Sequence, residues 1–186
     1  GDSVRAIIKE VRSDKRGPEI IISRADPSFL HKLFKNEVPE IEDGIIDIRT
    51  LHREPGDRTK IIVESHDKRI DAVGACVGMK GSRIQVIVRE LNGEKIDIIN
   101  YTSEPQLLVT RALSPAKPYR VTIDYEKHRA LALFEAEDIS IAIGKNGQNV
   151  RLASKVTGFE IDAKSRSEVE GPVEVEVYLE EVEGLP

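Results

Sequence analysis

Two stretches of sequence determine the expected fold: Val77-Gly78-Met79-Lys80-Gly81-Ser82-Arg83 and Ile143-Gly144-Lys145-Asn146-Gly147-Gln148-Asn149. In each, an aliphatic residue leads into a Gly-x-x-Gly tetrapeptide, and a helix is predicted to follow. We call residues 78–81 loop 1 and residues 144–147 loop 2. Glycines at this spacing also occur in plain turns between helices, so a single copy would indicate little about function.

The surroundings of the two loops repeat as well. Residues of similar character recur 66 positions apart through the loop and the helix after it, and 65 positions apart beyond that helix. The matched pairs are Val77 with Ile143, Gly81 with Gly147, Ile84 with Val150, Ile87 with Ala153, Gly93 with Gly158, and Ile96 with Ile161. Self-similarity at a fixed period indicates duplicated units.

Hydrophobic periodicity predicts the same order of elements around each loop: helix, strand, strand, helix, helix, strand. Around loop 1 we expect helices at residues 27–36, 72–77 and 82–91 and strands at 46–50, 59–65 and 95–100. Around loop 2 we expect helices at 105–113, 138–143 and 148–157 and strands at 119–125, 129–134 and 159–163. The fold class is therefore predicted to be α+β.

This order, with Gly-x-x-Gly between the last two helices, resembles the type II KH domain, whose loop clamps about four nucleotides of single-stranded RNA. Several longer segments resemble the NusA family of bacterial transcription elongation factors, and the resemblance covers nearly all of residues 1–165. These segments are residues 37–41, 53–58, 73–78, 91–98, 112–116 and 143–153.

The resemblance implies tandem type II KH domains preceded by the last strands of an OB-fold barrel. We expect the C-terminal part of that RNA-binding barrel at residues 1–26, a first KH domain at 27–102 (the first unit), a second at 103–166 (the second unit), and an acidic tail at 167–186. Only residues 4–11 and 19–23 read as barrel strands, so the barrel is incomplete. Because the chain starts with Gly1-Asp2, we interpret it as part of a longer protein, without the family's polymerase-binding N-terminal domain.

The formal net charge of −5 argues at first against a nucleic-acid partner. All 28 basic residues but only 26 of the 33 acidic residues precede Glu168, however, so residues 1–167 are slightly positive. Residues 72–89 and 139–159 contain lysine and arginine and no acid. Each loop is therefore expected in cationic surroundings, although a single cationic stretch would more simply be a solvated face.

The residue types predict how RNA would be held. Glycines let the backbone approach phosphates closely, and helices that start at Ser82 and Gln148 direct amides towards them. Lys80, Arg83, Lys145 and Arg151 add positive charge, and Gln148 and Asn149 are candidates for hydrogen bonds to sugar or base edges. The predicted RNA-binding residues are Gly78, Met79, Lys80, Gly81, Ser82, Arg83, Ile84, Ile98, Gly144, Lys145, Asn146, Gly147, Gln148, Asn149, Val150 and Arg151.

Three of these residues have a plain alternative. Ile84, Ile98 and Val150 are expected to line the groove for the bases, yet most of their surface is equally explained by core packing.

Other kinds of site are not supported by the sequence. A phosphate-binding P-loop at Gly144-Lys145 would need glycine at Ile139 and Ser or Thr at Asn146. Cys76 lies in an apolar predicted helix and is interpreted as a core residue. The four histidines are scattered without metal-ligand spacing. We expect no catalytic residues, no metal and no cofactor.

Composition limits the location. No apolar run approaches the roughly 18 residues of a membrane span, a single cysteine excludes an internal disulfide, and no leader-like segment opens the chain. We expect a cytoplasmic monomer with no membrane contact.

The resemblance implies that the chain binds nascent single-stranded RNA, with RNA polymerase and other elongation factors as partners, and modulates pausing, termination and antitermination. The alternative is a protein-docking scaffold with incidental RNA contact. In the tail, valines at 173, 175 and 177 alternate with Glu174 and Glu176, which predicts an edge strand, an acidic interaction segment or a disordered segment. One hypothesis is that this tail competes with RNA for the cationic loops, so that deleting residues 168–186 would tighten RNA binding.

Overall fold

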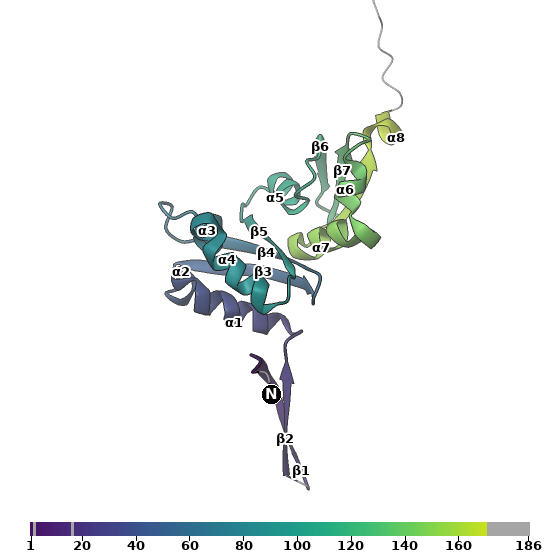
Figure 1. Ribbon diagram of the computed structural model, residues 1–186. Helices are drawn as coiled ribbons and strands as arrows, with labels where there is room; N and C mark the ends of the chain where they lie inside the picture. Colours follow the sequence, from purple (N-terminus) through teal and green to yellow (C-terminus); the bar gives the residue numbers. More distant parts are fainter. Residues whose placement is uncertain (2, 16, 171–186) are drawn as a thin grey trace, which may run out of the picture.

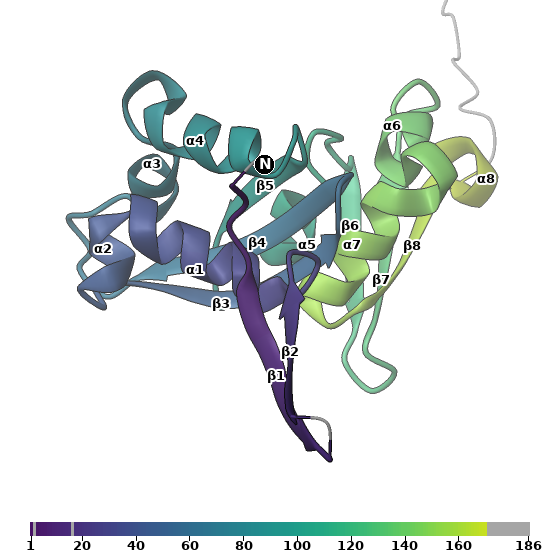
Figure 2. The same ribbon diagram turned by 60° about the horizontal axis from the view of Figure 1, so that its bottom comes forward.

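The computed structural model describes residues 1, 3–15 and 17–170, which form a projecting hairpin followed by two α+β units (Figures 1 and 2). The hairpin pairs β1 (Ile7–Asp14) with β2 (Gly17–Ser23) in antiparallel register. Its apolar side chains are largely exposed, from 58% at Ile20 to 71% at Val4, just before β1. Of the expected OB-fold strands, the structure shows this two-stranded ribbon. The barrel itself stays a prediction.

The first unit has the predicted order of elements, with one short helix, α2 (Pro39–Glu42), that was not predicted. Helices α1 (Pro27–Glu37) and α2 precede strands β3 (Ile46–Glu54) and β4 (Arg58–Ser65), and helices α3 (Ala72–Val77) and α4 (Ser82–Glu90) precede β5 (Lys95–Asn100). The sheet order is β3-β4-β5, with β3 and β4 antiparallel and β4 and β5 parallel. Helix α1 begins where the sequence predicts, because Pro27 fills its first turn and the Asp26 carboxylate accepts the N–H of Ser28.

The second unit repeats this order. It consists of α5 (Pro105–Ala112), β6 (Arg120–Asp124), β7 (Arg129–Phe134), α6 (Ile139–Ile143), α7 (Gln148–Thr157) and β8 (Glu160–Ser165). Its sheet order, β6-β7-β8, has the same parallel and antiparallel pairs as the first sheet. A short helix that was not predicted, α8 (Arg166–Glu170), begins the expected acidic tail. The alternating valines of that tail lie outside the described residues.

Each unit has its own hydrophobic core. In the first, α1, α3 and α4 cover one face of the sheet, and Phe34, Ile61 and Ile87 are almost fully buried between them. Cys76 belongs to this core, as the sequence predicts, and burial raises the pKa of its thiol to about 12. A thiol held protonated in this way is a packing residue rather than a nucleophile.

The opposite face of the first sheet is covered by the second unit. Ile62 and Ile99 of that face belong to the second core, together with Leu108 and Val109 of α5. Even Lys60 is fully buried there, because its ammonium donates to an Asp97 carboxylate oxygen at 2.6 Å and to the Ser114 carbonyl at 3.1 Å. Burial on both faces explains the unbroken buried run at residues 59–63 of β4. The second core therefore includes residues of both units, so the units pack directly against each other.

Candidate nucleic-acid interface

Loops 1 and 2 have almost the same backbone conformation. Gly78 and Gly144 have φ/ψ of 75°/169° and 74°/172°, and each is followed by a single 3₁₀ turn, Met79–Gly81 or Lys145–Gly147. Within these turns Lys80 and Asn146 adopt the left-handed conformation, at 52°/29° and 53°/30°. The sequence repeat is thus also a structural repeat at its most irregular point.

The first glycine of each loop is required for two reasons. Its conformation is essentially restricted to glycine, and a Cβ would lie 2.8 Å from the Arg83 Cγ at Gly78 or 2.8 Å from the Asn149 Cβ at Gly144. The second glycine has left-handed torsions, but the atoms nearest to a Cβ there would lie at ordinary contact distances of 3.7 Å at Gly81 and 3.8 Å at Gly147. The loop backbone therefore rests directly on the start of the following helix.

Two backbone amides at the end of each loop donate hydrogen bonds within the loop's own turn. The N–H of Gly81 donates to the Gly78 carbonyl at 3.0 Å, and that of Gly147 to the Gly144 carbonyl at 3.1 Å. The N–H groups of Ser82 and Gln148 donate to Met79 and Lys145. These four amides close the turns, so the prediction that backbone amides face phosphate does not apply to them.

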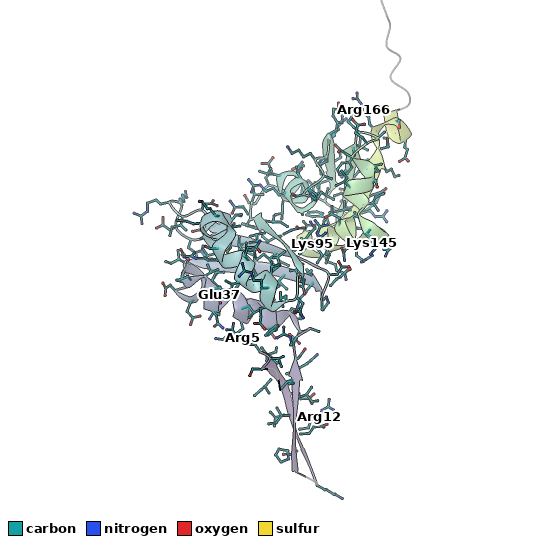
Figure 3. The ribbon with its side chains drawn as sticks, in the orientation of Figure 1. Arg5, Arg12, Glu37, Lys95, Lys145 and Arg166 are labelled. Carbon is teal, nitrogen blue, oxygen red and sulfur yellow. The ribbon has the colours of Figure 1, made fainter. Side chains whose placement is uncertain are left out.

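The side chains at the tips of the loops point outwards. Met79 is 87% exposed, and Lys80, Lys145 and Asn146 are also exposed (Figure 3 labels Lys145). Among the described residues, neither lysine has an ion pair or hydrogen bond. These two ammonium groups are available to an anionic ligand.

The cationic surroundings predicted from the sequence are weaker than expected, because acids from distant elements reach them. An Arg83 Nη donates to the Glu40 carboxylate at 2.9 Å and to the Ala75 carbonyl at 2.7 Å. Glu40 lies in α2, 43 positions from Arg83. No window around loop 1 reveals this partner.

Loop 2 is tied to the first unit in the same manner. The Gln148 amide donates to Glu54 at 2.8 Å and to Asp57 at 2.9 Å, and Arg151 donates to Glu54 at 2.8 Å. Glu54 ends β3, and Asp57 lies in the turn before β4. The hydrogen bond from Gln148, with a smaller contribution from Arg151, holds the pKa of Glu54 below its ordinary value. Gln148, predicted to contact RNA, thus makes a contact between the units.

Asn149 requires a correction. Its side chain is fully buried, and its amide nitrogen donates to the carbonyls of Leu113 and Ala142, each at 3.0 Å. It has no surface with which to bond sugar or base edges. An asparagine after a glycine-rich loop reads as a surface residue in the sequence, and only the packing of α5 against α7 encloses it.

The three aliphatic residues are half-buried. Ile84 and Ile98 pack against the first core, and Val150 packs against the second. Core packing, the alternative weighed from the sequence, accounts for this part of their surface. Their part in a groove for bases stays a prediction.

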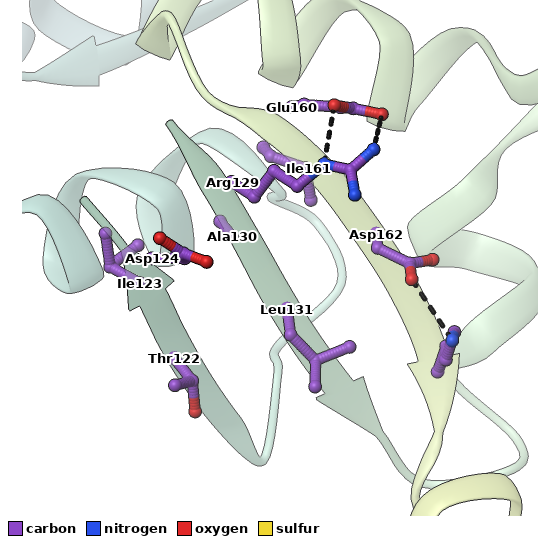
Figure 4. A pocket seen from close by; sticks show the side chains of 10 residues that line it. Thr122, Ile123, Asp124, Arg129, Ala130, Leu131, Glu160, Ile161 and Asp162 are labelled. Atoms are coloured by element: carbon purple, nitrogen blue, oxygen red, sulfur yellow. Dashed lines mark hydrogen bonds and ion pairs between the residues drawn. The ribbon is translucent and has the colours of Figure 1, made fainter. Parts of the chain in front are cut away.

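A separate hollow lies on the open face of the second sheet, and no residue of loop 1 or loop 2 lines it (Figure 4). Its charges are paired, with Arg129 donating twice to Glu160 at 2.8 and 2.9 Å and Lys164 3.2 Å from Asp162. We find no catalytic arrangement in it. Within residues 1, 3–15 and 17–170 no three His, Cys, Asp or Glu side chains cluster as a metal site, and no helix has the length and apolarity of a bilayer span.

Comparison with known families agrees with the repeat. Residues 24–101 match the model of the NusA-like first KH domain, and residues 105–171 match that of the NusA-like second KH domain. The chain belongs to the NusA family. Its tandem KH architecture is therefore that of this family, as the sequence predicts.

Relatives named transcription termination/antitermination protein NusA extend this result. The chain is 47% identical over 91% of its length to the protein of Halalkalibacterium halodurans, and 44% identical over 98% to that of Bacillus subtilis. It spans 44% and 48% of their lengths, so about half of each relative has no counterpart in this chain. A crystal structure described as APE1850 shares the fold, with a TM-score of 0.53, 20% identity, and coverage of 75% of this chain and 97% of the other.

Proposed function

We propose that this chain is the RNA-binding part of a transcription factor of the NusA family, and that loops 1 and 2 each clamp single-stranded RNA. The supporting observation is the matched backbone of the two loops, each with an exposed lysine that lacks a partner among the described residues. A Gly-x-x-Gly loop of this kind grips about four nucleotides through their backbone.

The proposed contacts are narrower than the set expected from sequence. Gly78, Met79, Lys80, Gly81 and Ser82 form the contact at loop 1, and Gly144, Lys145, Asn146 and Gly147 form that at loop 2. Ile84, Ile98 and Val150 are proposed to offer their exposed parts to bases. Arg151, which is exposed but paired with Glu54, is proposed to contribute once RNA displaces that carboxylate.

The test is the affinity for a single-stranded RNA of about ten nucleotides, enough for two grips of about four. The variants are Met79→Asp/Lys80→Asp at loop 1 and Lys145→Asp/Asn146→Asp at loop 2. Aspartate tolerates the left-handed conformation of Lys80 and Asn146, so these changes place carboxylates against phosphate without straining the loop. We expect each variant to lose at least about tenfold in affinity, and the parent's affinity to fall with salt.

A matched control is Tyr125→Asp/Lys127→Asp, which makes the same charge change of three units in the solvent-exposed turn between β6 and β7. It is expected to bind like the parent. Parent-like binding by both loop variants would refute the proposal and favour the docking scaffold. The exposed apolar ribbon β1–β2 is the feature that such a scaffold would use.

The wider role follows the names of the relatives. We propose that RNA held at the loops influences transcriptional pausing, termination and antitermination, that RNA polymerase and other elongation factors are partners, and that the chain acts as a cytoplasmic monomer without enzymatic activity. We further propose that residues 1–26 complete an OB-fold barrel with residues of the longer protein. Addition of those residues should then protect the β1–β2 amides from hydrogen exchange.

A further inference from the structure

The second residue of the helix after each loop contacts three parts of its own unit. This residue is Arg83 in the first unit and Asn149 in the second, 66 positions apart in the repeat. The two side chains differ in size and charge, yet they make the same kinds of contact.

In the first unit, Arg83 connects the two helices that flank loop 1. Its guanidinium bonds the Ala75 carbonyl in the last turn of α3 at 2.7 Å, and it bonds Glu40 of α2 at 2.9 Å. Its Cγ and backbone nitrogen would lie 2.8 and 3.0 Å from a Cβ at Gly78. Arg83 therefore joins the helix before the loop, the first helices of the unit and the loop itself.

In the second unit, Asn149 makes the equivalent three contacts with one amide. Its Nδ2 donates to Ala142 in the last turn of α6 and to Leu113 at the end of α5, both at 3.0 Å. Its Cβ and backbone nitrogen would lie 2.8 and 2.9 Å from a Cβ at Gly144. Its Oδ1 accepts no hydrogen bond from any described residue, so the donated bonds are the polar contacts that hold the side chain.

From this we infer that Arg83 and Asn149 are positioning residues, which set the geometry of loops 1 and 2 for RNA without contacting RNA themselves. An ion-paired arginine, 31% exposed, and a fully buried neutral amide produce the same loop torsions. The position is therefore defined by its contacts within the unit and not by charge. As it concerns RNA, this inference rests on the proposed function.

The physical need for such a residue lies in the backbone. In each loop three of the four residues have positive φ, namely Gly78, Lys80 and Gly81 in loop 1 and Gly144, Asn146 and Gly147 in loop 2. Conformations of this kind persist only where the surrounding structure over-determines them. Joining the two flanking helices to a third element supplies that constraint.

The test uses Asn149→Leu and Arg83→Met, which keep side-chain bulk and remove the donors. Two readouts are measured: RNA affinity, and hydrogen exchange of the Gly81 and Gly147 amides, whose bonds to Gly78 and Gly144 close the turns. We expect Asn149→Leu to accelerate exchange at Gly147 but not at Gly81, and to lose about tenfold in RNA affinity. Arg83→Met should show the converse.

Lys80→Met is the matched control, because it removes the same charge at loop 1 from a side chain that has no hydrogen bond or ion pair with the residues that the structure describes. It should reduce the slope of log RNA affinity against log salt concentration by about the amount expected for one phosphate contact. It should leave the hydrogen exchange rate of the Gly81 amide unchanged. If Arg83→Met behaves like Lys80→Met in both readouts, Arg83 is an RNA contact and the inference fails for loop 1.

Unchanged Gly147 exchange in Asn149→Leu would overturn the inference for loop 2. Should that variant not fold, Asn149→Ala, which adds no bulk, is measured in its place. If the parent binds no RNA, the proposed function fails, while the exchange data on the RNA-free protein still decide whether these residues position the loops.

Discussion

Loops 1 and 2 share a backbone but differ in what lies beside them. The arginine near loop 1 pairs with Glu40 of its own unit. At loop 2, Gln148 and Arg151 bond Glu54 and Asp57 of the other unit. Loop 1 is thus complete within one unit, whereas the helix behind loop 2 is held by both.

This difference gives the two copies of the loop different electrostatic surroundings. The end of β3 and the turn after it contact α7, and the carboxylates of Glu54 and Asp57 lie at the N-terminal end of this helix, where an anion is favoured. Under the proposed function, RNA at loop 2 is bound next to these carboxylates, whereas the acid paired beside loop 1 is Glu40. The two clamps are therefore expected to differ in affinity and in dependence on the neighbouring unit.

The largest effect is expected from Glu94, which anchors the β3–β4 turn. Its carboxylate is fully buried and accepts bonds from Arg53, from the Thr59 hydroxyl and from the Gly56 amide in the turn. Because Glu94→Gln leaves the buried Arg53 charge without its partner, we expect a loss of about 3 kcal/mol or more in the free energy of unfolding. Urea unfolding measures this loss.

The surface pair Arg129 and Glu160 is the matched control, since it has the same two-bond geometry in solvent. Glu160→Gln should leave the unfolding free energy nearly unchanged. An equal loss in both variants would contradict the role of burial.

Acid provides a second check on Glu94. Burial raises the pKa of this carboxyl, but the bonds from Arg53, Thr59 and Gly56 outweigh burial and hold the pKa below its ordinary value of 4.5. The folded state therefore releases this proton more readily than the unfolded state. The stability from Glu94 is complete above that ordinary value and is lost as the pH falls towards the folded pKa, so Glu94→Gln should flatten the acid limb of the stability curve.

The second prediction compares the glycines. At Gly144 an added Cβ meets the Cβ and backbone nitrogen of the buried Asn149 at 2.8 and 2.9 Å, whereas at Gly78 its two shortest contacts are with the Arg83 Cγ and the Ser82 hydroxyl, which can move, and the Arg83 backbone nitrogen lies at 3.0 Å. We expect Gly144→Ala to cost about 3 kcal/mol and Gly78→Ala about 2 kcal/mol. At Gly147 and Gly81 only the left-handed conformation opposes alanine, and about 1 kcal/mol is expected. Thermal unfolding should follow this order, and equal costs at Gly144 and Gly147 would contradict the close contact.

The smallest effect is expected at Glu54. Glu54→Gln removes the carboxylate that neutralises Arg151, so RNA affinity should rise about two- to threefold through loop 2 alone. Titration of the parent and the variant at low salt measures this rise. Glu64→Gln removes an equivalent charge that pairs with Arg49, away from α7, and serves as the control. A similar rise in RNA affinity in the Glu64→Gln control would mean that net charge, and not the release of Arg151, causes the effect.

Periodicity predicted nearly all elements of both units, because each has an apolar face and a local stop signal such as Asn92-Gly93. Helix α2 and α8 were missed, since each spans only four or five residues and carries no periodic signal. For the candidate site, the loops were located from glycine spacing together with its repetition in matching surroundings. The roles expected for Gln148 and Asn149 needed revision, because their partners lie up to 94 positions away.

The sequence by itself determined the repeat, the order of elements and the position of both loops, because these depend on local spacing and on glycine conformations. Only the tertiary structure decided which charges remain available to a ligand. Arg83 and Arg151 look alike in sequence to Lys80 and Lys145, but the first pair reaches carboxylates and the second pair does not. Ion pairing depends on distances across the fold, which no local pattern encodes.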